Sequence, residues 1–188
     1  MRCWLSSRPQ TPVTGTDRAM VDVLTPDQRR LNMRRISSGN TKPEMMIRQG
    51  LHSRGFRFRL HCRNLPGRPD IVFPRYRAVI MVHGCFWHGH DCPHFKLPAT
   101  RPEFWSAKIF GNKRRDARAL KNLAAAGWRA LVVWECALKG PGRRPLEDVL
   151  KLCDRFLCVD ATKNYIECRG LRYERRKDHP ANLFAVSV

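Results

Sequence analysis

Hydrophobic and polar positions follow a helical period in four stretches of the chain. Two Thr-x-x-Gln/Glu capping signals, each with a proline in the first turn, begin at Thr25 and Thr41 and predict two consecutive helices. A third such signal at Thr100 predicts a long helix that ends before Gly127, the expected C-cap glycine. Residues 145–157 predict a closing helix.

Four shorter stretches have the pattern of β-strands. Residues 56–60 alternate apolar and basic side chains, which is typical of a half-buried strand. Residues 71–73, 77–82 and 128–134 are apolar runs of strand length, and the first two of these are expected to pair as an antiparallel hairpin. The order of helix, helix, three strands, helix, strand and helix predicts an α/β fold with a mixed central β-sheet flanked by helices.

The two ends of the chain lack this periodicity. We expect residues 1–24 to be a disordered N-terminal extension and residues 161–188 to be a basic C-terminal extension. Residues 25–160 are then expected to form one domain, which suits a chain of 188 residues.

The charge of the chain predicts a polyanionic partner. Lys and Arg number 36 against 16 Asp and Glu, a formal net charge of +20, and nucleic acid is the usual partner of so basic a protein. A basic tail without such a partner is the alternative. The start of the chain has no signal-peptide apolar core, and no apolar run approaches the ~20 residues of a membrane span. We therefore predict a cytoplasmic protein without membrane association, in which the 8 cysteines are not paired as disulfides.

Residues 82–92, directly after an apolar run, concentrate metal-binding side chains. Cys85, His90 and Cys92 offer two thiolates and an imidazole within a few residues, the donors that tetrahedral zinc sites use. The fourth ligand must come from elsewhere, and Cys136, which follows the apolar run 131–134, is the candidate. The pattern predicts one structural zinc ion.

A second kind of metal site is predicted beside the first. Asp70 precedes the strand 71–73, and the hairpin places it next to Val82 at the end of the partner strand. A carboxylate and a backbone carbonyl suit Mg²⁺. His83 and His88 would flank that ion, and one of them could take a proton from water, which gives metal-dependent phosphodiester hydrolysis. If Asp70 only caps a turn, the chain is a non-catalytic zinc DNA-binding module.

Five segments together resemble the very-short-patch (Vsr) mismatch-repair endonucleases of bacteria. They are residues 32–34, 65–70, 83–88, 98–101 with 104–105, and 134–138. The resemblance implies a restriction-endonuclease-like fold and a monomer that nicks double-stranded DNA beside a T:G mismatch, the product of 5-methylcytosine deamination. A restriction-type endonuclease that cuts matched DNA is the alternative. Whether mismatch-repair proteins are partners is left open.

The resemblance also implies roles for residues of the candidate active site, which would use two Mg²⁺ ions. Asp70 matches the metal-binding catalytic aspartate and His88 the catalytic histidine. Glu44 and His83 match residues near the metals, although Thr41-x-x-Glu44 also reads as a capping box with a purely structural role. The position whose backbone carbonyl binds Mg²⁺ is usually threonine in the family and is Val82 here.

The same resemblance implies how DNA is contacted. Phe86, Trp87 and Trp105 match aromatic side chains that intercalate from the major groove, and Met33 matches an apolar residue that enters the minor groove. Core packing is the alternative for the aromatic residues. The last two matches, a polar pair near the scissile phosphate, are Asn112 and Asp116.

Overall fold

A computed structural model describes residues 25–35, 39–159 and 165–170. The chain divides into two compact units, and the first contains the helix α1 (Pro26–Arg35). The predicted capping box of α1 is confirmed, because Gln28 N donates to Thr25 Oγ1 at 3.3 Å and Thr25 N donates to Gln28 Oε1 at 2.9 Å. The Met33 side chain and the predicted extension 1–24 lie outside the described part, as does most of 161–188.

The second unit is built on a mixed sheet, as the sequence predicts. Its strand order is β1-β2-β3-β4-β5, with antiparallel pairing from β1 to β3 and parallel pairing from β3 to β5. The strands are β1 (Arg59–Leu60), β2 (Ile71–Phe73), β3 (Ala78–His83), β4 (Arg129–Trp134) and β5 (Tyr165–Cys168). The first strand is shorter than predicted, and the sequence analysis did not predict β5 at all.

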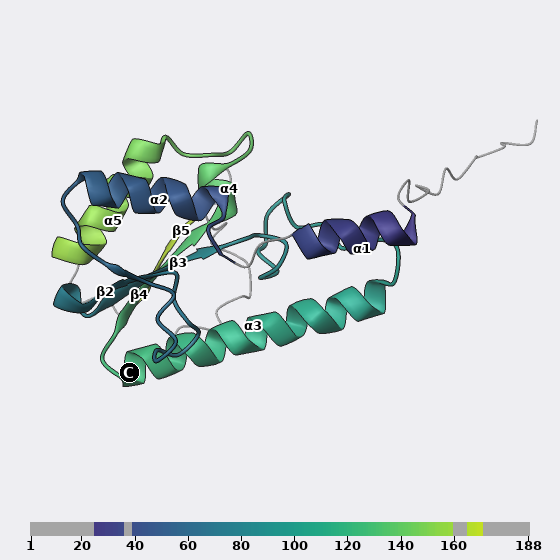
Figure 1. The fold of residues 1–188 in the computed structure, drawn as a ribbon, viewed down its shortest axis with the longest axis horizontal. Coiled ribbons are helices and arrows are strands. Elements are labelled where there is room, and N and C mark those ends of the chain that lie inside the picture. The colour runs from purple at the N-terminus through teal and green to yellow at the C-terminus, as the bar shows by residue number, and fades with distance from the viewer. Residues whose placement is uncertain (1–24, 36–38, 160–164, 171–188) are drawn as a thin grey trace, which may run out of the picture. The chain divides into compact units, whose positions relative to one another are not determined.

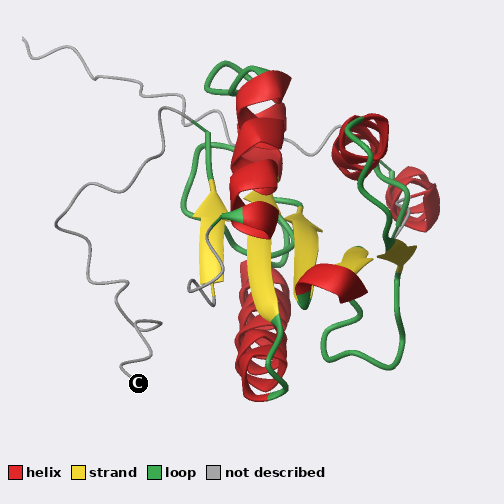
Figure 2. Cartoon of the chain, turned by 90° about the vertical axis from the view of Figure 1, so that its left-hand side faces the viewer, coloured by secondary structure: helices red, strands yellow, loops and turns green. Residues whose placement is uncertain are grey.

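Helices cover both faces of this sheet (Figure 1). α2 (Lys42–Ser53) and α5 (Leu146–Cys158) lie on one face and contact each other, whereas the long α3 (Pro102–Ala125) crosses the other face. Figure 2 shows the strands between these helices. A short helix, α4 (Glu135–Leu138), follows β4 directly and was not predicted.

Alternate residues of each strand supply two separate cores, because successive strand side chains point to opposite faces. The core under α2 and α5 contains Ile47, Leu51, Ile80, Leu131 and Phe156. The core on the α3 side contains Val79, Met81, Leu123, Val132 and three cysteines, Cys85, Cys92 and Cys136. The cysteine-rich loop is therefore continuous with the hydrophobic core under α3.

The helix termini confirm one predicted cap of this unit and correct another. Thr41 is the N-cap of α2, and its Oγ1 accepts a hydrogen bond from Glu44 N at 3.4 Å. α3 begins with Pro102, and its N-cap is Arg101, which has a φ of 56° and makes no side-chain capping bond. The prediction of Thr100 as N-cap was wrong by one residue, because the proline itself starts the first turn with its fixed φ. No helix in the described ranges is long and apolar enough to span a membrane.

Candidate active site and metal centre

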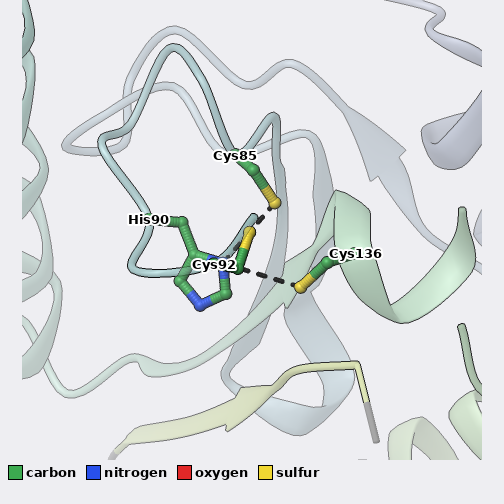
Figure 3. Close-up of side chains that lie close together, drawn as sticks. All are labelled: Cys85, His90, Cys92 and Cys136. Carbon is green, nitrogen blue, oxygen red and sulfur yellow. Dashed lines mark hydrogen bonds between the residues drawn. The ribbon is translucent and has the colours of Figure 1, made fainter. Parts of the chain in front are cut away.

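The parallel pairing of β3 and β4 creates the thiol cluster. His83 is opposite Trp134 in the register, so the loop after β3 and the helix α4 after β4 start side by side. The loop supplies three ligands and α4 supplies the fourth. Together they are Cys85, His90, Cys92 and Cys136 (Figure 3), with all four ligand atoms within 4.8 Å of one another. The set predicted from sequence is thus brought together.

The environment of the thiol cluster suits a soft metal ion. Hydrogen bonding to Cys85 lowers the pKa of Cys136, and the same contact raises the pKa of Cys85, so that one thiolate and one thiol share a proton. His90 Nδ1 is 3.5 Å from both sulfur atoms. The His90 ring stacks on Trp134 with centroids 4.1 Å apart, while Nε2 is buried without a hydrogen-bond partner among the described residues. Stacking therefore fixes the ring with Nδ1 toward the sulfurs, which fits a closed tetrahedral site.

Asp70 lies at the opposite end of the hairpin from the turn, as predicted. Its Oδ2 accepts a hydrogen bond from Val82 N at 2.7 Å. Burial raises the pKa of the Asp70 carboxyl, the Val82 N–H opposes this shift, and the charge of Glu44 adds to it. The carboxylate is therefore fixed by the backbone at the sheet edge, in a place where its negative charge is incompletely compensated by the protein.

Glu44 brings a second carboxylate to this place. It is 2% exposed, and its Oε1 lies 3.1 Å from Arg48 Nη1 and 3.2 Å from His61 Nε2. A buried charge needs such partners. Glu44 can therefore have both roles. Its backbone N–H donates to the N-cap residue Thr41, while its carboxylate lies near Asp70.

His61 is the residue of this cluster that the sequence analysis missed. Its Nδ1 is 3.8 Å from Asp70 Oδ1, and one ligand atom each from Glu44, His61 and Asp70 lie within 4.8 Å of one another. The sequence offered only a weak signal, a lone histidine at the end of an alternating strand.

A histidine pair lies next to these carboxylates. His83 and His88 stack with ring centroids 3.8 Å apart, and His88 Nδ1 is 2.7 Å from Asp116 Oδ2. Burial first, and then His88, lowers the pKa of His83 to about 3, so that this ring is neutral near pH 7. His88 is close enough to lower the pKa of Asp70 electrostatically. The histidine pair therefore lies within electrostatic range of the Asp70 carboxylate.

α3 holds this part of the loop through two polar side chains one turn apart. Asp116 orients the His88 ring, and Asn112 donates from Nδ2 to the backbone oxygen of Trp87 at 2.7 Å. A carboxylate facing Nδ1 of His88 favours the tautomer with its proton on Nδ1 and a lone pair on Nε2.

The three predicted intercalating residues form one half-buried aromatic group beside the thiol cluster. The Phe86 ring lies 5.1 Å from Trp87 and 5.4 Å from Trp105, and the two tryptophan rings are 6.0 Å apart. Each of the three residues is of intermediate burial. These residues are therefore packed against one another without being sealed in the core.

Comparisons with known proteins decide the family. A family model described as DNA mismatch endonuclease Vsr matches residues 21–94. The DNA mismatch endonuclease Vsr of Escherichia coli K12 is 42% identical over 152 residues, which cover 81% of this chain and 97% of that protein. This chain belongs to the Vsr endonuclease family.

Other relatives of this Vsr endonuclease carry a related description. The type II nicking enzyme V.XorIIP of Xanthomonas oryzae pv. oryzae is 54% identical over 123 residues, or 65% of this chain and 90% of that enzyme. The type II nicking enzyme V.NmeAIP of Neisseria meningitidis is 41% identical over 120 residues, or 64% and 86%. The Vsr-family chain is accordingly a DNA-nicking endonuclease, a hydrolase of phosphodiester bonds.

Proposed function

We propose that this endonuclease nicks one strand of double-stranded DNA at a T:G mismatch, with Mg²⁺ at the Asp70 site and a structural zinc ion at the thiol cluster. The observation that carries the proposal is the His88–Asp116 pair, with 2.7 Å between His88 Nδ1 and Asp116 Oδ2, within electrostatic range of the buried Asp70 carboxylate. The names of the relatives support mismatch-directed nicking.

Oxygen atoms of the chain would hold the catalytic cation. Asp70 is fixed by Val82 N, the Val82 carbonyl is on the same strand end, and Glu44 adds a second carboxylate. These are the hard donors that Mg²⁺ takes, with water and phosphate completing its shell. When bound, Mg²⁺ supplies charge stabilisation for the phosphate and the leaving oxygen.

His88 would act as the general base. Its Nδ1 is held by Asp116, so Nε2 is free to accept a proton from the attacking water. His83 stacks on this ring in the neutral form, because burial keeps its pKa at about 3. A neutral His83 supports the orientation of the ring without adding a second positive charge.

The aromatic group would open the mismatch. Phe86, Trp87 and Trp105 pack edge to face and so are restrained before DNA arrives. Insertion between base pairs costs a few kcal/mol of unstacking, and a weakened T:G pair lowers that cost. Met33 would enter the minor groove. The exposed basic run Lys113, Arg114 and Arg115 on α3 is suited to phosphate contacts.

The test is a nicking assay on three duplexes that differ at one pair, T:G, T:A and C:G. We expect one strand of the T:G duplex to be cut, and cutting to be lost in Asp70→Ala and His88→Ala while DNA binding is retained. Equal cleavage of all three duplexes would indicate a restriction-type enzyme. Retained nicking in both variants would reject the assigned active site.

A further inference from the structure

His61 lies between the two carboxylates of the Asp70 site. Its Nε2 is 3.2 Å from Glu44 Oε1 and its Nδ1 is 3.8 Å from Asp70 Oδ1. The side chain is 23% exposed, so it borders the open part of the site. The ring therefore presents nitrogen atoms to the same space that the two carboxylates face.

The backbone holds the ring in this position. His61 follows β1 and has a φ of 47°, in the left-handed region that non-glycine residues seldom occupy. Its N–H donates to the backbone oxygen of Asp70 at 3.2 Å. A residue kept in such a conformation next to an active site points to a functional constraint.

Each of the two carboxylates also has a partner other than His61. Arg48 already pairs with Glu44 at 3.1 Å, and Val82 N already donates to Asp70 at 2.7 Å. The imidazole of His61 is thus an additional potential metal ligand beside two carboxylates that have other hydrogen-bond partners. One ligand atom from each of the three residues lies within 4.8 Å of the others, which suits a shared cation.

We propose that His61 is a nitrogen ligand of the divalent cation held by Glu44 and Asp70, and that it gives the site a preference for first-row transition ions such as Mn²⁺ over Mg²⁺. The proposal rests on the proposed function of the Asp70 site. Imidazole adds affinity for transition ions, whereas Mg²⁺ prefers oxygen ligands and readily keeps water instead.

The experiment uses the full-length, zinc-loaded protein without DNA and Mn²⁺ as the probe. Electron paramagnetic resonance measures the free Mn²⁺ during titration, and electron spin-echo modulation detects a ¹⁴N nucleus bound to it. We expect ¹⁴N coupling in the wild type and its loss in His61→Asn, in which asparagine tolerates the positive φ. The Mn²⁺ affinity should fall at least about 10-fold. The Mg²⁺ affinity, from competition, should change by less than about 3-fold.

His52→Asn is the matched control, because His52 is exposed on α2 and contacts Phe58 rather than the carboxylates. It should bind Mn²⁺ as the wild type does, and circular dichroism checks that both variants are folded. Persistent ¹⁴N coupling or unchanged Mn²⁺ affinity in folded His61→Asn overturns the role of His61. Asp70→Asn separates the two proposals: if it too leaves Mn²⁺ binding unchanged, the proposed cation site itself is wrong.

Discussion

The thiol cluster and the candidate active site share one loop, with His83 and Cys85 only two residues apart, but they differ in their exposure to solvent. His83 ends β3, and Cys85 follows after Gly84. All four residues of the thiol cluster are buried. In the candidate active site Glu44 and His83 are buried, while Asp70 is 22% exposed and His88 and Asp116 are each 26% exposed.

This difference in exposure fits a structural role for the thiol cluster and a chemical role for the candidate active site. A closed set of thiolates and an imidazole leaves no position for a substrate and suits a structural ion. Carboxylates and imidazoles at an open edge can meet water and a phosphate. The backbone links the two, since His90 N donates to Cys85 O at 2.9 Å and His88 N to Gly84 O at 3.2 Å. The loop that holds the residues of the thiol cluster therefore also carries His88.

The largest expected effect comes from breaking the closed site with Cys136→Ser. Structural zinc contributes roughly 10 kcal/mol or more in small zinc domains, as much as the whole stability of many proteins. We expect loss of zinc and of the near-UV circular dichroism signal, measured together with metal analysis. Cys158→Ser, at an exposed thiol, is the control and should keep both. Full zinc content in a folded Cys136→Ser protein would refute the ligand set.

Asp70→Asn in the candidate active site should have the opposite effect on stability, because it should abolish activity without unfolding the protein. Nicking should fall by about 10³-fold or more, because a metal ion supplies several kcal/mol of stabilisation to the transition state. The thermal stability of the Mg²⁺-free protein should rise at pH 7.

The sign of the stability change follows from the Asp70 pKa, which burial raises above its ordinary value of 3.8. The folded wild type binds the proton more tightly than the unfolded chain, so its stability falls as pH rises through the folded pKa. Asparagine avoids this loss. The difference between variant and wild type should therefore shrink as the pH of the thermal melts is lowered from 7 toward 3.8 and stay constant below 3.8. A stability deficit of the variant at pH 7 would contradict this explanation.

The sequence predicted those features that depend on local spacing or on one strand pairing. The hairpin placed Asp70 beside Val82, and the parallel register of β3 and β4 brings Cys136 to the loop that carries Cys85. Both predictions follow from the positions at which apolar runs end, so they needed no knowledge of side-chain conformation.

Features that depend on tertiary contacts were missed. His61 meets Glu44 only because α2 packs beside the end of β1, and no sequence spacing reports this contact. β5 is only four residues long and is held by its parallel pairing with β4. Glu44 illustrates both kinds of feature. The hydrogen bond of its backbone N–H to Thr41 was predicted from local spacing, whereas the contacts of its carboxylate with Arg48 and His61 were not.

Within the open site, Asp116→Asn tests the orientation of His88. An amide at this position can donate to Nδ1, which moves the proton to Nε2 and removes the base. We expect the nicking rate to fall about 10²-fold with DNA affinity nearly unchanged, measured by single-turnover kinetics and equilibrium binding. Asp148→Asn, the same change at an exposed position of α5, is the control. A loss of affinity without a change in rate would assign Asp116 to DNA contact instead.

The smallest expected effect comes from Cys153, a buried thiol outside the thiol cluster whose pKa is shifted in the opposite direction to that of Cys136. Burial raises the pKa of Cys153 far above its ordinary value of 9.0, whereas its hydrogen bond to Cys85 lowers that of Cys136. Above about pH 9 the unfolded chain loses the Cys153 proton and the folded protein keeps it, so the free energy of unfolding falls by at most about 1.4 kcal/mol per pH unit. Urea unfolding of the zinc-loaded protein from pH 8 to 10 should therefore show a weaker pH dependence in Cys153→Ala than in the wild type. The exposed Cys158→Ala should keep the wild-type dependence, and identical slopes in all three proteins would show that the Cys153 thiol ionises as readily in the folded protein as in the unfolded chain.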